Sequence, residues 1–178
     1  MRPSVADPHL SAVLSRGPSV ALAISCPAWE RAVPEIERLS LAAARLALKN
    51  SGMPDETELS LVLTDDREIR ELNRAWRGQD KPTNVLSFPG DRAASAPGAP
   101  VLLGDVIVAY ETACREVEGG AAASLSDHLA HLIVHGVLHL VGHDHEEDTE
   151  AEAMERLESR LLAELGIPDP YHERRSSQ

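Results

Sequence analysis

The stretch HGVLHLVGHDH, residues 135–145, constrains the fold of this chain more than any other feature of the sequence. It places four histidines and an aspartate in eleven positions, where a helix is expected to end. Residues four apart on a helix lie one above the other, so His135 and His139 are expected to point the same way. Gly142 is expected to break the helix, so that the chain turns back and presents His145 to the same point.

His135, His139 and His145 therefore predict a metal site on a helix and the turn that follows it. Three imidazole ligands suit one Zn²⁺ per chain and leave a fourth position for water, as in catalytic zinc sites. The pKa of a water molecule bound to such an ion can fall to about 7. Nickel, cobalt and copper also bind imidazole, so the pattern does not fix the metal.

Other polar residues lie beside the three predicted ligands. His131 is one turn before His135, and two roles stay open for it: hydrogen bonding to a ligand, or an ordinary place on the helix face. His128 is expected to be an ordinary core or surface histidine. His143 is expected to be exposed on the turn, while Asp144 either orients a ligand or only solvates the turn.

The histidine spacing also resembles that of the metzincin proteases. Their motif has a glutamate directly after the first histidine, which activates water and passes a proton to the leaving amine. Here that position is Gly136. A metalloprotease is therefore a less favoured alternative.

The remaining pattern predicts an α/β (α+β) fold. Strands are expected at 19–25, within 58–66, at 83–88 and at 104–110, and helices at 34–49, 67–76, 111–118, 124–141 and 149–165. Helices between the earlier strands indicate parallel pairing, whereas the loop after the third strand indicates antiparallel pairing with the fourth. We expect a small four-stranded mixed sheet with helices, and the metal site on a C-terminal helix and the turn after it.

The helix expected at 67–76 has two different faces. Its buried stripe is expected to consist of Ile69, Leu72 and Trp76. Its other side carries Arg70, Arg74 and Arg77, which Lys81 continues. Such a row is either a local basic surface or an ordinary solvated face, and the second reading is better for Arg70 and Arg74. The next strand either lines a groove with Asn84 and Ser87 or is a plain sheet strand.

Length and composition predict one domain at 19–171, a flexible tail at 1–18 and a frayed end at 172–178. No apolar run approaches the roughly 20 residues of a membrane helix, so no membrane partner is expected. Cys26 and Cys114 lack metal or redox spacing and are typical of a cytoplasmic protein.

The charge of the chain limits the partners that it can bind. The formal net charge is −12, which argues against general affinity for nucleic acid, and DNA is not an expected partner. A polyanion would have to be bound by a local basic surface.

Three separate blocks resemble the YbeY family of bacterial metal-dependent endoribonucleases, the rRNA maturation RNases. HGVLHLVGHDH is similar to the family signature His-Gly-x-Leu-His-Leu-x-Gly-(Tyr/His)-Asp-His. LNRAWRGQDKPTNVLSFP, residues 72–89, resembles a second hallmark, and LLGDVIV, residues 102–108, resembles the Leu-Gly-Asp strand. The resemblance covers about residues 20–171.

The resemblance implies a zinc-dependent hydrolase in which His135, His139 and His145 hold the ion and Arg77 has a functional role in catalysis. It implies single-stranded RNA as substrate, with roles in 16S rRNA 3′-end maturation and ribosome quality control, and the ribosome or ribosomal proteins as partners. A non-catalytic ribosome-assembly or RNA-binding factor with a structural metal stays open. So does the choice between water and the RNA 2′-hydroxyl as the attacking group.

Overall fold

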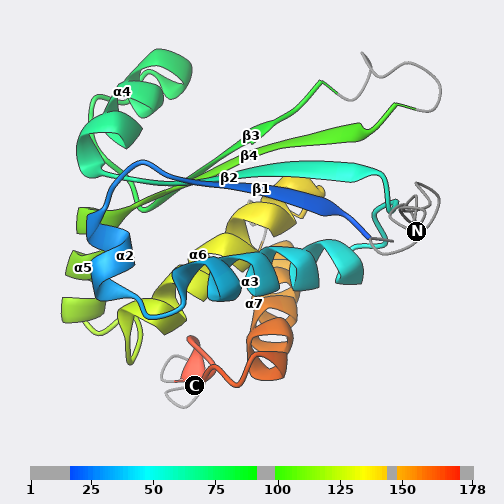
Figure 1. Ribbon diagram of the computed structural model, residues 1–178. Coiled ribbons are helices and arrows are strands. Elements are labelled where there is room, and N and C mark those ends of the chain that lie inside the picture. The colour runs from blue at the N-terminus through cyan, green and yellow to red at the C-terminus, as the bar shows by residue number, and fades with distance from the viewer. Residues whose placement is uncertain (1–16, 92–98, 144–147, 173–178) are drawn as a thin grey trace, which may run out of the picture.

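A four-stranded mixed sheet forms the centre of the computed structural model, which describes residues 17–91, 99–143 and 148–172 (Figure 1). Its strands are β1 (Ser19–Ile24), β2 (Thr57–Thr64), β3 (Val85–Pro89) and β4 (Val101–Ala109), in the order β1-β2-β4-β3. β1 pairs with β2 and β2 with β4 in parallel, whereas β3 runs antiparallel to β4. The predicted α/β (α+β) class and the mixed sheet are confirmed.

The helices are α2 (Ala28–Ala32), α3 (Ile36–Asn50), α4 (Asp66–Arg77), α5 (Tyr110–Glu118), α6 (Leu125–Leu140) and α7 (Asp148–Glu164). All but α2 follow the predicted ranges to within a few residues. The five-residue α2 is too short to produce a recognisable apolar period. Within the described ranges, no helix has the length and apolar character needed to cross a membrane.

The two faces of the sheet are covered unequally. Leu59, Leu61 and Leu63 alternate along β2 as predicted and are buried in the main core, to which α3, α6 and α7 contribute. The opposite face carries a smaller cluster around Ile69 of α4 and Leu86 of β3. Figure 1 shows α4 on one side of the sheet and α3, α6 and α7 on the other.

Helix α4 departs from the predicted burial at its last turn. Ile69 is fully buried, but the prediction that Trp76 belongs to the buried stripe is wrong, because its side chain is 74% exposed. The small cluster under α4 extends only to Leu72 and Phe88, so the last turn runs past most of the apolar surface that could cover it. Gly78, at φ 69°, then ends the helix.

Helix α6 approaches the sheet closely at Gly136. A Cβ atom at this position would lie 2.6 Å from Val106 Cγ1 and 3.1 Å from Ser87 Oγ. The Ser87 hydroxyl donates a hydrogen bond of 2.9 Å to the carbonyl oxygen of Gly136. The missing side chain thus allows the helix to contact both β3 and β4.

We expect Gly136→Ala to lower the free energy of unfolding by about 1–3 kcal/mol, because the methyl group overpacks against buried Val106. Helix propensity alone predicts the opposite, a gain of about 1 kcal/mol. Urea unfolding measures the difference. The double variant Gly136→Ala/Val106→Ala restores the space for the methyl group. It should therefore lose less unfolding free energy than the two single variants lose together. A stabilised single variant would contradict the packing argument.

Candidate metal centre

Four histidines form a continuous row along α6. Neighbouring ring centroids lie 6.2 Å apart for His128 and His131, 6.3 Å for His131 and His135, and 4.6 Å for His135 and His139. The helical period therefore places them on one face, as the sequence predicts. His128 is 4% exposed, so it takes the buried one of the two ordinary positions expected for it.

The end of α6 is fixed by a glycine turn. Gly142 has φ 102°, and its N–H donates to the carbonyl oxygen of His139. The N–H of His143 donates to the carbonyl of Leu138, which completes the pair of bonds of a Schellman motif. The predicted turn directly after the helix is thus present. His145 and Asp144 lie outside the described residues.

His135 and His139 bring two ring nitrogens together. Their Nε2 atoms are 3.1 Å apart, and the rings meet at 82°. Two nitrogens bound to one tetrahedral zinc ion at the usual bond length lie about 3.3 Å apart. The pair therefore already has the spacing that two ligands of one ion require.

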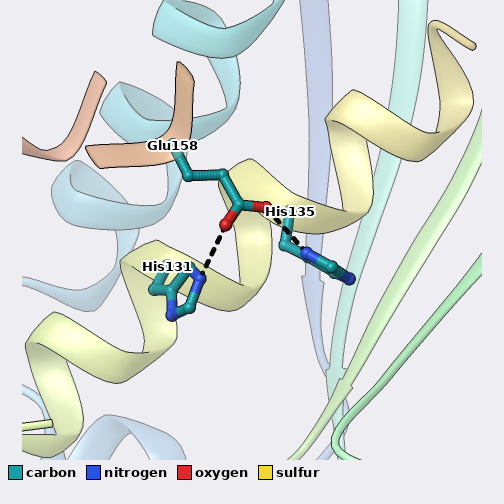
Figure 2. Close-up of side chains that lie close together, drawn as sticks. All are labelled: His131, His135 and Glu158. Atoms are coloured by element: carbon teal, nitrogen blue, oxygen red, sulfur yellow. Dashed lines mark hydrogen bonds and ion pairs between the residues drawn. The ribbon is translucent and has the colours of Figure 1, made fainter. Parts of the chain in front are cut away.

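Glu158 of α7 holds the other side of the His135 ring (Figure 2). Its Oε1 accepts from His135 Nδ1 at 2.7 Å, and its Oε2 lies 3.1 Å from His131 Nε2 and also accepts from the Tyr171 hydroxyl. The Glu158 side chain is only 1% exposed, so its carboxylate accepts hydrogen bonds from three protein groups in place of water.

The protonation state of Glu158 follows from these contacts. Burial by itself raises the pKa of this carboxyl, but hydrogen bonds from His131 and His135 lower it to about 2. An ionised carboxylate only accepts hydrogen bonds, so Nδ1 of His135 carries a proton. In the neutral ring, Nε2 is then the nitrogen that carries the lone pair, on the side of His139.

The structure offers two donor sets that share His135. Within the described ranges, His131, His135 and Glu158 have ligand atoms within 4.8 Å of one another. However, both oxygens of that carboxylate already accept hydrogen bonds. The Nε2 atoms of His135 and His139 instead face each other at 3.1 Å, which favours their side for an ion. A metal-ligating histidine commonly donates a hydrogen bond from the N–H of its second ring nitrogen to a carboxylate, as His135 does to Glu158.

Arg77 is joined to α6 through the edge strand. Its Nη2 donates to the carbonyl oxygen of Ser87 at 3.1 Å, and its Cζ lies 6.0 Å from the centre of the Phe88 ring. The Ser87 hydroxyl in turn donates to Gly136, the residue next to His135. The predicted catalytic arginine and the predicted ligands are therefore linked by two successive hydrogen bonds and a single strand.

The same close packing bears on the protease alternative. A side chain at position 136 points at Val106 and Ser87 of the sheet, where even a Cβ atom is crowded. A glutamate there could not be accommodated beside the histidines without moving the helix. The structure thus gives a physical reason for the absence of the metzincin base.

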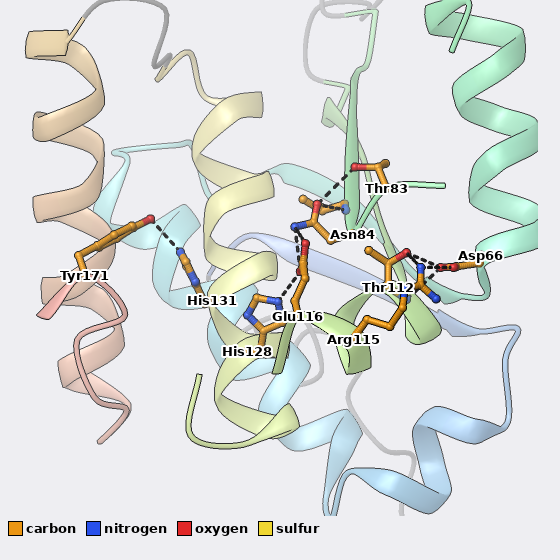
Figure 3. A network of polar contacts seen from close by, with 10 residues as sticks. Asp66, Thr83, Asn84, Thr112, Arg115, Glu116, His128, His131 and Tyr171 are labelled. Atoms are coloured by element: carbon orange, nitrogen blue, oxygen red, sulfur yellow. Dashed lines mark hydrogen bonds and ion pairs between the residues drawn. The ribbon is translucent and has the colours of Figure 1, made fainter. Parts of the chain in front are cut away.

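A cleft of about 1020 Å³ opens beside His135 and continues along the histidine row. Glu116 in its wall accepts from Asn84 Nδ2 at 3.0 Å and from His128 Nε2 at 2.7 Å, as Figure 3 shows. Burial raises the pKa of Glu116, but these hydrogen bonds from His128 and Asn84 outweigh it, so the pKa lies below its ordinary value. Asn84 therefore lines a cleft, one of the two roles left open for it, and the cleft wall is partly acidic.

We expect Glu158→Gln to weaken metal binding by about 10- to 100-fold, the usual cost of changing the partner of a ligating histidine. Glutamine keeps the size of the side chain but supplies a neutral acceptor to His135 Nδ1, which makes the ring a poorer ligand. Titration with zinc in competition with a chelator measures this affinity. Glu152→Gln is the matched control, because Glu152 is exposed on the same helix and pairs with Arg156. Equal affinities for both variants would contradict the role given to Glu158.

Comparisons with known proteins agree on one family. The family model described as Endoribonuclease YbeY matches residues 24–166. Endoribonuclease YbeY of Paramagnetospirillum magneticum is 52% identical over 158 residues, covering 86% of this chain and 96% of the relative. The Azorhizobium caulinodans protein of the same name is 54% identical over 144 residues, covering 79% and 88%. The solution structure of a Thermotoga maritima protein shares the fold, with a TM-score of 0.51 at 23% identity over 89% of this chain and 93% of that one. The chain therefore belongs to the YbeY family of endoribonucleases.

Proposed function

We propose that this chain is a zinc-dependent, single-strand-specific endoribonuclease that acts in 16S rRNA 3′-end maturation and ribosome quality control. Membership of the family supports internal cleavage of RNA. The observation that carries the metal dependence is the 3.1 Å approach of two imidazole Nε2 atoms, one of them on a ring whose Nδ1 is held by Glu158.

The proposed zinc ligands are His135 and His139 of α6 together with His145 after the turn. When bound, zinc supplies a Lewis acid that activates water and polarises a phosphoryl oxygen. Glu158 orients His135 through Nδ1, and His131 and Tyr171 in turn hold the carboxylate of Glu158.

Arg77 is the proposed partner of the scissile phosphate. Cleavage of a phosphodiester increases the negative charge on its non-bridging oxygens, and a guanidinium pairs with two such oxygens through parallel N–H bonds. The bond to Ser87 uses one of the five N–H groups of the side chain and positions the rest.

The acidity of the chain supports a dependence on the ribosome. A molecule with a net charge of −12 and only a local basic surface should bind free RNA weakly, so we propose that ribosomal proteins or rRNA structure in the cytoplasm supply further contacts. Tight binding to free RNA that falls steeply with salt would contradict this part of the proposal.

The direct test is cleavage of an end-labelled RNA in single-stranded form and in a duplex of the same sequence. We expect purified protein with one zinc per chain to cut the single strand in preference to the duplex. Removal of zinc with a chelator should stop cleavage, and restoring zinc should restart it. Analysis of the product ends then separates attack by water from attack by the 2′-hydroxyl.

Each other outcome has a distinct meaning. Cleavage that survives complete removal of the metal contradicts the zinc-dependent mechanism. A protein that holds one zinc per chain, binds ribosomes and cuts no RNA would instead be the non-catalytic assembly factor.

A further inference from the structure

Trp76 presents an aromatic surface to solvent beside Arg77. The indole is 74% exposed, and Trp76 and Leu102 are the exposed large apolar residues within the described ranges. Its ring centre lies 6.2 Å from that of Phe88 at an angle of 56°, and the Arg77 guanidinium lies 6.0 Å from the same Phe88 ring. We call these three side chains, Trp76, Arg77 and Phe88, the α4 platform.

The platform is held in place from two sides. Phe88 packs partly into the small cluster under α4, and the Ser87 carbonyl accepts from Arg77. Ser87 also donates to Gly136, beside the proposed ligand His135. Because β3 is an edge strand of the sheet, only this strand separates the platform on one face from the proposed metal site on the other.

Charge distinguishes the platform from the cleft that opens beside His135. Arg74, Arg77 and Lys81 are exposed around the last turn of α4, whereas Arg70 is already paired with Asp80 at 2.8 Å. The cleft wall instead includes Glu116, Asp127 and Asp169. Glu68 and Glu71 are exposed on the earlier turns of α4, so a polyanion is favoured at its last turn and disfavoured along the cleft.

We propose that the α4 platform binds an unpaired RNA base by stacking on Trp76, while Arg77 pairs with the adjoining phosphate. This inference rests on the proposed function, because it assumes a single-stranded RNA substrate. Flat aromatic rings beside guanidinium groups bind bases that are free to unstack, and a base within a duplex is not. The platform thus gives a physical basis for single-strand preference.

The two tryptophans allow a direct test of base contact. Trp29 is fully buried in the main core, so the indole that a nucleic acid can reach is that of Trp76. We would titrate the zinc-loaded protein with a 2′-O-methyl single-stranded oligonucleotide and record tryptophan emission. The comparison ligand is an abasic oligomer of the same length, which keeps the phosphates but lacks the bases.

We expect the base-containing strand to quench the emission and shield it from acrylamide, and the abasic strand to do neither. Trp76→Ala should weaken binding by about 5- to 30-fold and raise KM for RNA cleavage by a similar factor. Trp76→Phe should retain most of the affinity. Leu102→Ala is the matched control, because Leu102 is 51% exposed on β4, and its affinity should equal that of the wild type.

Unchanged emission at saturating oligonucleotide, or wild-type affinity and KM in Trp76→Ala, would overturn the proposal. If wild type still cuts RNA in that case, the endoribonuclease function stands without the platform. If the oligonucleotide quenches the tryptophan emission but the protein cuts no RNA, base binding by the platform is supported and the proposed endoribonuclease function is contradicted. Loss of ribosome binding in Trp76→Ala with unchanged affinity for the oligonucleotide would also overturn it, and would assign the surface to a protein partner.

Discussion

His139→Ala should reduce zinc-dependent cleavage of single-stranded RNA by at least about 1000-fold, because the Lewis acid contributes several kcal/mol to the barrier reduction. The reason lies in the geometry of α6. His139 Nε2 faces His135 Nε2 at 3.1 Å, so the variant removes one of two converging donors while its backbone remains in the last turn of the helix. The measurement is the initial cleavage rate, together with the zinc content of each purified protein.

The control for this prediction comes from the same stretch of sequence. His143→Ala also removes an imidazole, but His143 takes part in the Schellman turn through its backbone N–H, and its side chain is expected to lie outside the ligand set. The variant should keep both zinc and cleavage. Loss of zinc in His143→Ala but not in His139→Ala would overturn the proposed ligands. Equal cleavage by wild type and His139→Ala would point to a contaminating nuclease.

The sheet could be predicted from the sequence because its strands carry a clear local signal. Leu59, Leu61 and Leu63 alternate with less buried residues, and this period of two is produced by a strand with one face on the core. The start of β4 had no such signal. That strand begins at Val101, three residues before the predicted start, where its pairing with Thr57 extends the ladder. Such boundaries depend on pairing with a strand that is distant in the sequence, and the local pattern of residues carries no information about that pairing.

The burial of Trp76 was mispredicted for a related reason. Its spacing from Ile69 and Leu72 fits an apolar stripe, but a stripe is buried only as far as the partner surface extends. The cluster under α4 ends near Phe88, the ring that Trp76 meets. Sequence period identifies the face of a helix, whereas the length of the covered part depends on the sheet beneath it.

The candidate site shows the same division between local and distant information. The pair His135 and His139 and the turn at Gly142 could be predicted, because helical geometry and one glycine determine them. Glu158 could not be assigned a partner, since it reaches His135 only through packing of α7 on α6. One signal was nevertheless present: Glu158 falls four residues after buried Met154 and three before buried Leu161. A carboxylate on an apolar stripe indicates a buried partner.

The role of Arg77 gives the second large expected effect. Arg77→Ala should lower kcat by about 100- to 1000-fold, the usual cost of removing a donor that stabilises developing charge. The Arg77 side chain is exposed, and β3 is an edge strand on which water can replace the arginine at the Ser87 carbonyl, so folding and zinc content should be unchanged. Arg77→Lys should restore only part of the rate, because an ammonium keeps the charge but cannot make two parallel bonds.

A loss of activity in Arg77→Ala could also come from weaker general attraction of RNA to α4. A variant at a second arginine of this helix distinguishes that explanation from a specific contact with the phosphate. Arg67 is exposed in the first turn of the same helix, so Arg67→Ala removes the same charge far from Ser87. Under saturating RNA and excess zinc, Arg67→Ala should retain kcat and show at most a salt-dependent rise in KM. If both variants lose the same activity, and salt removes the difference from wild type, Arg77 contributes only to the local field. If Arg77→Ala alone loses kcat at every salt concentration, the loss belongs to the forked contact with the reacting phosphate.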